Sequence, residues 1–110
     1  MQFDPHAAIV NRDTGQPLLD EAKPVTLGFA VVRALDARYR DDENAAPSAL
    51  FERYRLASRI RKAAPDATLT LSIDEAKLIK DTVPKMFPPG IFGQIWDALD
   101  TAAGAGGRAG

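Results

Sequence analysis

Apolar residues recur at helical spacing in several stretches of the chain, and the first stretch follows Pro24. Thr26 has the side chain of an N-cap, so the pattern predicts a helix over residues 26–40. Gly28 weakens such a helix by roughly 1 kcal/mol relative to alanine, which favours a close neighbour packed against it. The residues expected on its buried face are Leu27, Val31, Val32, Ala34, Leu35 and Tyr39.

A second helix is predicted over residues 47–64, between two prolines. Pro47 fits the first helical turn, and Pro65 ends the helix because the residue before proline avoids the α region. Arg53 and Arg61 fall within or beside the apolar arc, so we expect their stems to pack while their heads reach water. The arc consists of Leu50, Leu56, Ala57, Ile60 and Ala64, with Tyr54 at its margin.

Two further helices are predicted in the last third of the chain. Ser72 followed by Glu75 is a capping-box signature that opens a helix over residues 73–83, and Pro84 ends or kinks it. A final helix is expected from Pro89 or Gly90 to about Thr101, and its apolar arc must dock on another element. That arc consists of Ile91, Phe92, Ile95, Trp96, Ala98 and Leu99.

The remaining apolar segments have the pattern of short strands. Residues 7–10 and 17–19 flank the turn-forming sequence NRDTGQ and predict a hairpin. Residues 67–71, ATLTL, alternate polar and apolar side chains and predict one further strand, for which the hairpin is the expected partner. Together the elements predict a small, mainly helical α+β domain over residues 1–103, with about four helices. The Gly-rich residues 104–110 are expected to form a flexible tail.

Composition narrows the possible chemistry. The 110 residues include no cysteine, which excludes disulfides, thiolate zinc sites and cysteine nucleophiles. The net charge of −1 gives no global field that favours nucleic acid or a membrane, but residues 47–66 hold five bases against two acids. No apolar run approaches the roughly 20 residues of a membrane span, and the start of the chain lacks a signal-peptide pattern, so we expect a soluble intracellular protein.

Side chains that carry catalysis are scarce, and each has an ordinary structural interpretation. His6 is the only histidine and lies in a terminal segment, while Ser48 and Ser72 are placed at predicted helix starts, so no catalytic triad is expected. The acids at 41–43 lack the ligand spacing of a calcium loop and are interpreted as a solvated loop. The sequence therefore predicts no enzymatic activity, no metal site and no cofactor.

Basic residues gather on one face of the second predicted helix. Arg55, Arg59 and Lys62 fall together at a spacing that suits successive phosphates of a nucleic acid, or an acidic protein. The alternative is an ordinary solvated face, and Glu52 beside these residues counts against nucleic acid. This face is a candidate contact surface.

Aromatic residues gather near the last helix and form a second candidate surface. Phe87, Phe92 and Trp96 either complete the core or leave an apolar interface for a partner or a second copy of the chain. The last helix is too apolar to stand alone in water, which favours the core for this group.

Five segments, in order over about residues 11–100, resemble a group of small proteins encoded by tailed bacteriophages and prophages. They are TGQPL, KPVTLGFAVVRAL, RYRLASRI, LSIDEAKLIKDTV and FPPGIFGQIWDAL. The pattern of the group often has a polar residue where Phe29 stands. The resemblance implies a bacterial-cell setting and a phage accessory or assembly role, and it supplies no catalytic residues.

Plentiful amphipathic helices without a reactive cluster favour a non-catalytic protein-interaction module, encoded by a phage or prophage. The expected partner is a phage or host protein, or a second copy of the chain, in the bacterial cytoplasm, with association with the virion left open. The alternative is a nucleic-acid-binding accessory protein that uses Arg55, Arg59 and Lys62. No membrane partner is expected.

Overall fold

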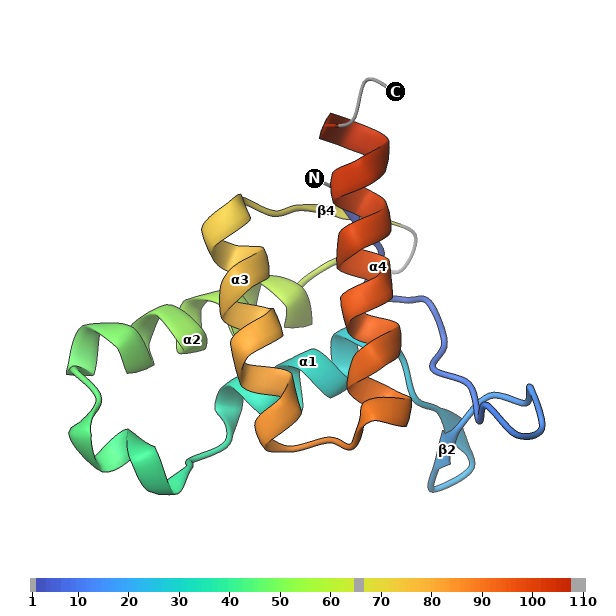
Figure 1. Ribbon diagram of the computed structural model, residues 1–110, viewed down its shortest axis with the longest axis horizontal. Coiled ribbons are helices and arrows are strands. Elements are labelled where there is room, and N and C mark those ends of the chain that lie inside the picture. The colour runs from blue at the N-terminus through green and yellow to red at the C-terminus, as the bar shows by residue number, and fades with distance from the viewer. Residues whose placement is uncertain (1, 65–66, 108–110) are drawn as a thin grey trace.

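The computed structural model describes residues 2–64 and 67–107, which form a small, mainly helical α+β fold, as predicted (Figure 1). Four α-helices dominate these residues, and two 3-10 turns and four two-residue strands connect them. The helices are α1 (Leu27–Asp36), α2 (Pro47–Arg61), α3 (Ile73–Thr82) and α4 (Pro89–Gly107). The 3-10 turns are η1 (Arg40–Asn44) and η2 (Val83–Lys85), and the strands are β1 (Gln2–Phe3), β2 (Leu19–Asp20), β3 (Lys23–Pro24) and β4 (Leu69–Thr70).

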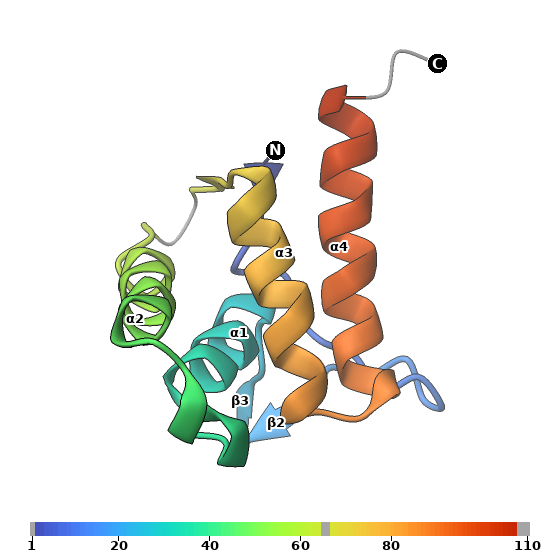
Figure 2. The same cartoon turned by 60° about the vertical axis from the view of Figure 1, so that its left-hand side comes forward.

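The hydrophobic core lies where α1, α3 and α4 meet, with β1 packed against α4. Helices α3 and α4 run side by side in both views, and α2 packs on α1 at the opposite flank from α4 (Figure 2). Leu56, Ala57 and Ile60 of α2 belong to the same buried cluster. The largest fully buried side chains come from the N-terminal segment, α1 and the last third of the chain. They are Phe3, Ile9, Val31, Leu71, Ile79, Val83, Ile95 and Leu99.

Helix α1 begins where the sequence predicts and ends four residues early. The hydroxyl of Thr26 accepts a hydrogen bond from the N–H of Phe29, which confirms the N-cap. Gly28 has the expected close neighbour, because a Cβ there would lie 2.7 Å from the Cβ of Pro5. The predicted extension to residue 40 is wrong. The backbone turns extended at Ala37, and Tyr39 folds back to donate its hydroxyl to the carbonyl of Ala34 at 2.7 Å.

Helix α2 begins at Pro47 and ends at Arg61, three residues before the predicted end. Leu56, Ala57 and Ile60 are buried as expected, whereas Ala64 lies exposed beyond the helix. The expectation that the head of Arg53 reaches water is wrong, because its guanidinium is buried against the carboxylate of Asp42 at 2.8 Å.

The N-terminal hairpin is confirmed, but its ladder lies further along the chain than residues 7–10 and 17–19. Those two segments share a single bridge, Val10 to Pro17, and the paired strands are β2 and β3. Glu21 and Ala22 between them both have positive φ, as a tight two-residue hairpin turn requires. The predicted further strand is β4, and its partner is β1 rather than the hairpin.

Helices α3 and α4 begin where the sequence predicts. The capping box is confirmed, because the Ser72 hydroxyl accepts from the N–H of Glu75 and the Glu75 carboxylate accepts from the N–H of Ser72. Helix α4 continues to Gly107 rather than ending near Thr101. The flexibility of residues 104–110 stays a prediction, and residues 108–110 lie outside the described residues.

The side chain of Gln94 joins α4 to the N-terminal segment. Its Oε1 accepts from the N–H of Val10 at 3.0 Å, and its Nε2 donates to the carbonyl of Val10 at 2.8 Å. This pair of bonds satisfies both backbone groups of a residue that lies 84 positions earlier in the chain.

Across residues 2–64 and 67–107, no helix combines the length and hydropathy that crossing a bilayer requires.

Candidate functional site

A groove of about 440 Å³ separates α3 from α4. Ala76 and Leu99 are buried at its base, and Ile73 and Trp96 are its exposed apolar residues. The side chains on its edge are charged: Lys77, Lys80, Asp81 and Asp100. An apolar hollow with a polar edge is the anatomy of a surface that takes an apolar side chain from a partner.

The predicted aromatic group is divided between the core and this groove. Phe87 and Phe92 are partly buried and pack against the core, whereas Trp96 keeps 36% of its surface exposed. The Phe92 and Trp96 rings contact each other at a tilted angle, with their centres 5.5 Å apart. The Nζ of Lys80 also lies 5.5 Å from the centre of the Trp96 ring, and it pairs with Asp100. Trp96 is therefore held in place at the groove.

Ile73 is a groove residue that the sequence analysis did not select. It is 78% exposed, more than any other large apolar side chain in the described residues. It occupies the first position of α3, directly after the N-cap Ser72, where no earlier turn of helix covers it. An isoleucine at a first helical position is the sequence signal that could have drawn attention to it, because polar residues are usual there.

The basic residues of α2 do not form an unbroken positive surface. Arg59 pairs with Glu75 and donates from Nη2 to the carbonyl of Thr70 at 2.9 Å, so it joins α2 to α3 and β4. Arg55 lies over the ring of Phe51, 5.9 Å from its centre, and Lys62 is exposed at the end of the helix.

The cleft that Arg55 and Arg59 line between α2 and α3 also contains three carboxylates. These belong to Glu52, Asp74 and Glu75, so acids outnumber bases around a hollow of about 460 Å³. Phosphate groups would be repelled from this cleft rather than attracted to it. Nucleic-acid binding stays a prediction that the cleft does not support.

Two exposed aromatic residues on α2 were also missed. Phe51 and Tyr54 are more than half exposed and stack on each other, with ring centres 5.9 Å apart and an interplanar angle of 22°. The helical pattern placed Tyr54 at the margin of the buried arc and did not single out Phe51. They lie one turn apart on the outer face of α2, where a spacing of three residues brings side chains together.

Asp42, Arg53 and Tyr39 form a buried polar cluster between η1 and α2. The interpretation of residues 41–43 as a solvated loop is wrong for Asp42, which is 6% exposed. Its carboxylate accepts from Arg53 and, at 2.8 Å, from the N–H of Tyr39. The hydrogen bond from Arg53 is the main reason that the pKa of Asp42 lies below its usual range. Burial raises the pKa of the Tyr39 phenol.

These shifts favour the ionised carboxylate and the neutral phenol, which are the ordinary forms of both groups near neutral pH. Among the described residues, no buried side-chain nitrogen or oxygen atom lacks a hydrogen-bond partner, and the bonds of this cluster hold η1 against α2. We assign it a structural role.

His6 is likewise engaged within the fold. Its Nε2 donates to the carbonyl of Ala64, just beyond the end of α2. The carboxylate of Asp4, two residues earlier, accepts from the backbone N–H of His6. Within residues 2–64 and 67–107, no three histidine or acidic side chains gather closely enough to hold a metal ion.

No protein-family model, curated protein or solved structure matches the chain. Function is therefore inferred from the surfaces that the fold creates and from the chemistry of the residues that line them. Among the residues predicted to form contact surfaces, Trp96 lies at an open apolar groove, Arg59 is engaged in the fold, and Phe87 and Phe92 lie partly in the core.

Proposed function

We propose that this protein is a non-catalytic protein-interaction module and that the groove between α3 and α4 is its contact surface. The observation that carries the proposal is the exposure of Ile73, which is 78% open to solvent at the edge of an apolar groove. Fully burying an isoleucine side chain contributes about 1.5–3 kcal/mol. Covering Ile73 and Trp96 together would supply much of the affinity of a small interface.

The partner that fits this groove is an amphipathic helix of another protein. Two roughly parallel helix axes with a channel between them take a third helix through apolar side chains spaced three or four residues apart. Lys77, Lys80, Asp81 and Asp100 then meet the polar edges of that helix. Charges of both signs on the rim select the register of the partner more than they add affinity.

The setting of the interaction is proposed from the resemblance to small phage and prophage proteins. In that setting the module is an accessory or assembly protein in the cytoplasm of a bacterial host, or a component associated with the virion. The partner is then a phage or host protein.

Site-specific photo-crosslinking tests the groove. A photoreactive amino acid replaces Ile73 in one variant and Leu19 in a matched control, since Leu19 is 63% exposed in β2 and lies outside the groove. We expect a discrete partner crosslinked from position 73 and not from position 19. That partner, once purified, should bind Ile73→Asp at least about tenfold more weakly than the wild type, while Leu19→Asp binds normally.

Equal binding by Ile73→Asp and the wild type would contradict the proposal. Light scattering after size-exclusion chromatography distinguishes a second copy of the chain as the occupant. A dimer that Ile73→Asp dissociates would contradict a separate partner protein. A strict monomer with no crosslink at position 73 would contradict the module itself.

The nucleic-acid alternative is tested with the same protein. Fluorescence anisotropy with labelled single- and double-stranded oligonucleotides at low salt measures any binding. If the alternative is correct, neutralising Arg55, Arg59 and Lys62 weakens binding and flattens its salt dependence. No binding at low salt removes it.

A further inference from the structure

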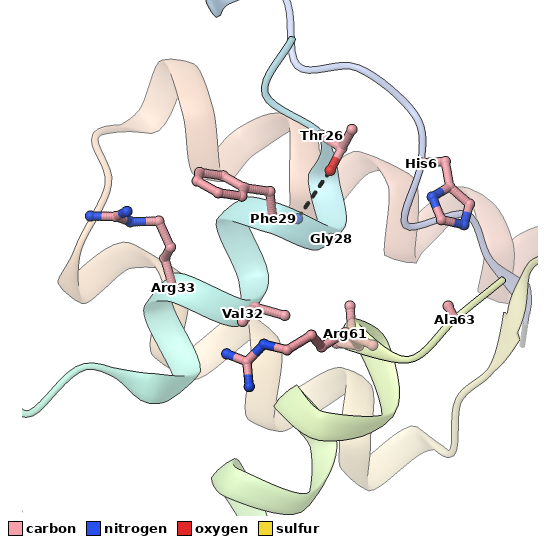
Figure 3. Close-up of a pocket in the computed structure, with 9 residues that line it drawn as sticks. His6, Thr26, Gly28, Phe29, Val32, Arg33, Arg61 and Ala63 are labelled. Atoms are coloured by element: carbon pink, nitrogen blue, oxygen red, sulfur yellow. Dashed lines mark hydrogen bonds between the residues drawn. The ribbon is translucent and has the colours of Figure 1, made fainter. Parts of the chain in front are cut away.

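A second hollow, of about 350 Å³, lies between the start of α1, the end of α2 and the N-terminal segment at Pro5 and His6 (Figure 3). The contact between Gly28 and Pro5 fixes this N-terminal segment against α1, and the hydrogen bond from His6 to Ala64 fixes it to the end of α2. The walls are thus held by separate contacts on two sides. A volume of this size falls within the usual range for pockets that bind small molecules, about 300–1,000 Å³.

The interior of the hollow is apolar. Val32 and Ile60 line it together with Phe29, whose ring is 43% exposed. Figure 3 shows both Phe29 and Val32 on α1, with the Phe29 ring directed toward Arg33 and Val32 beside Arg61. A ring or a branched aliphatic group is the kind of ligand body that such a wall accepts.

The charged residues that line the hollow are basic, although Asp36 pairs with Arg61 at the rim. Arg33 and Arg61 line it, and none of the nine lining residues is an aspartate or glutamate. Three other hollows each have at least one carboxylate in their walls: Glu52, Asp74 and Glu75 in one, Asp13 in another, and Asp81 and Asp100 in the groove. In a chain of net charge −1, this local positive charge favours an anionic ligand.

The two guanidinium groups lie away from His6, toward the other end of the hollow (Figure 3). Arg33 lies over the Phe29 ring, 5.6 Å from its centre, and makes no ion pair within residues 2–64 and 67–107. Arg61 pairs with Asp36 on the exposed rim through one nitrogen, which leaves its other N–H groups for a second acceptor. A planar guanidinium can bind a carboxylate through two parallel hydrogen bonds.

The first backbone N–H groups of α1 are engaged within the fold and are not free to bind an anion. The N–H groups of Leu27 and Gly28 donate to the carbonyls of Ala7 and Pro5 at 2.8 Å, and the N–H of Phe29 donates to Thr26. Recognition of an anion therefore depends on the two arginine side chains.

We propose that this hollow binds an organic carboxylate with an aromatic or branched apolar body. The carboxylate lies on Arg33 and Arg61, and the apolar body packs on Phe29 and Val32. Two sources share this chemistry, a free aromatic acid and the C-terminal residue of a peptide. The site is separate from the groove between α3 and α4, so its failure leaves the proposed function untouched.

An NMR titration with N-acetylphenylalanine and with its neutral amide tests the proposal on the isotopically labelled protein. We expect saturable shifts of the backbone amides in residues 26–33 and 60–63 with the acid, and affinity at least about tenfold lower with the amide. A peptide with the sequence acetyl-Gly-Gly-Phe, ending in a free carboxylate, is the second arm. Tighter binding of the peptide assigns the site to a chain terminus, and equal or weaker binding assigns it to a free acid.

Three variants separate the pocket from general surface charge. Arg33→Gln should lower the affinity for the acid about tenfold, whereas Arg38→Gln, an exposed arginine outside the hollow, should leave it unchanged. Val32→Phe keeps every charge but fills the hollow, and should abolish saturable binding. Circular dichroism checks the fold of each variant.

Equal affinity for the acid and the amide would overturn the proposal, as would the absence of saturable binding. The same holds if Arg38→Gln weakens binding as much as Arg33→Gln does, or if a folded Val32→Phe binds like the wild type. The comparison of acid with amide needs no variant, so the test stands even if Val32→Phe does not fold.

Discussion

Two arginines of α2 that the helical pattern places in similar positions have opposite environments. Arg53 and Arg61 each pair with an aspartate that precedes α2 in the chain, Asp42 and Asp36. The side chain of Arg53 is 9% exposed and that of Arg61 is 58% exposed. The difference arises because η1 brings the carboxylate of Asp42 to Arg53 in the middle of α2, whereas Arg61 lies at the exposed C-terminal end of the helix. An arginine within an apolar arc is buried where another segment brings a carboxylate to it.

This difference has an energetic consequence. Exposed ion pairs contribute about 0–1 kcal/mol, because water and salt screen them. A buried pair costs desolvation to form, and removing one partner leaves the other charge buried without compensation. The loss on breaking the pair at Asp42 should therefore exceed the loss at any exposed pair of this helix.

The largest expected effect comes from Arg53→Ala. It leaves the Asp42 carboxylate buried without its guanidinium, and the free energy of unfolding should fall at least about three times as far as for Arg61→Ala. Urea denaturation monitored by circular dichroism measures both. The double variant Arg53→Met with Asp42→Leu should recover much of the loss, because an apolar pair replaces the ionic one. Equal losses for the two single variants would mean that burial of the pair has no energetic weight.

Lowering the pH should destabilise the fold through protonation of the buried Asp42 carboxylate. The folded-state pKa of Asp42 is lowered mainly by the hydrogen bond from Arg53. Its contribution to stability is therefore complete above the unfolded value near 3.8 and is lost as the pH falls through the lower folded-state pKa. Asp41, whose pKa is lowered by its hydrogen bond to Lys85, adds to the loss in the same direction.

Stability measured from pH 6 down to pH 2 in wild type and Asp42→Asn checks this expectation. The variant should start less stable and lose less stability than the wild type over the acid range, so the two curves converge. Asp97→Asn, at an exposed helical position, is the matched control and should follow the wild-type curve. Parallel curves for wild type and Asp42→Asn would contradict the assigned role.

Glu75 takes part in both a helix cap and an exposed ion pair, so its variants measure the two contributions to stability separately. One carboxylate oxygen accepts from the N–H of Ser72, and the other pairs with Arg59. Glu75→Ala removes both interactions and should cost about 1–2 kcal/mol, whereas Glu75→Gln keeps the capping hydrogen bond and should cost about 0.5 kcal/mol. Thermal denaturation of the two variants separates the contributions. Equal costs would show that the ion pair, and not the cap, carries the stability.

The smallest effect is expected for Arg61→Ala. Its pair with Asp36 is exposed on both sides, so the free energy of unfolding should change by about 0.5 kcal/mol or less. Raising the salt concentration should reduce even this difference between variant and wild type. A loss of stability close to that of Arg53→Ala would contradict the distinction between the buried and the exposed ion pair of α2.

The parts of the fold that sequence reasoning predicted correctly depend on neighbours in the chain. The cap at Thr26 and the capping box of Ser72 and Glu75 are bonds between residues three positions apart. The tight packing at Gly28 follows from the absence of a side chain, although Pro5 could not be named as its neighbour. Local chemistry of this kind is present in the sequence whatever the rest of the chain does.

The incorrect predictions depend on segments that are distant in the chain. Apolar residues continue at helical spacing to Tyr39, but α1 ends before that residue. The backbone N–H of Tyr39 donates instead to the carboxylate of Asp42 in η1, which caps the start of that turn. The pairing of β1 with β4 joins residues 68 positions apart and leaves almost no signal in two-residue strands. Among the candidate site residues, Trp96 could be selected as an aromatic residue on a helix. The place of Ile73 in the groove follows only from how α3 and α4 lie beside each other.

The bond between Gln94 and Val10 also has a consequence for protein synthesis. The ribosome releases Phe3, Ile9 and Val10 long before it makes α4. Ile9 and Val10 can pair early with residues 17–25, but the contacts of β1 with α4 and the hydrogen bonds of Val10 with Gln94 have to wait for the last helix. Phe3 and Ile9 are fully buried in the finished fold. A nascent chain arrested before α4 therefore presents apolar surface to chaperones, and the last helix acts as the closing step of folding.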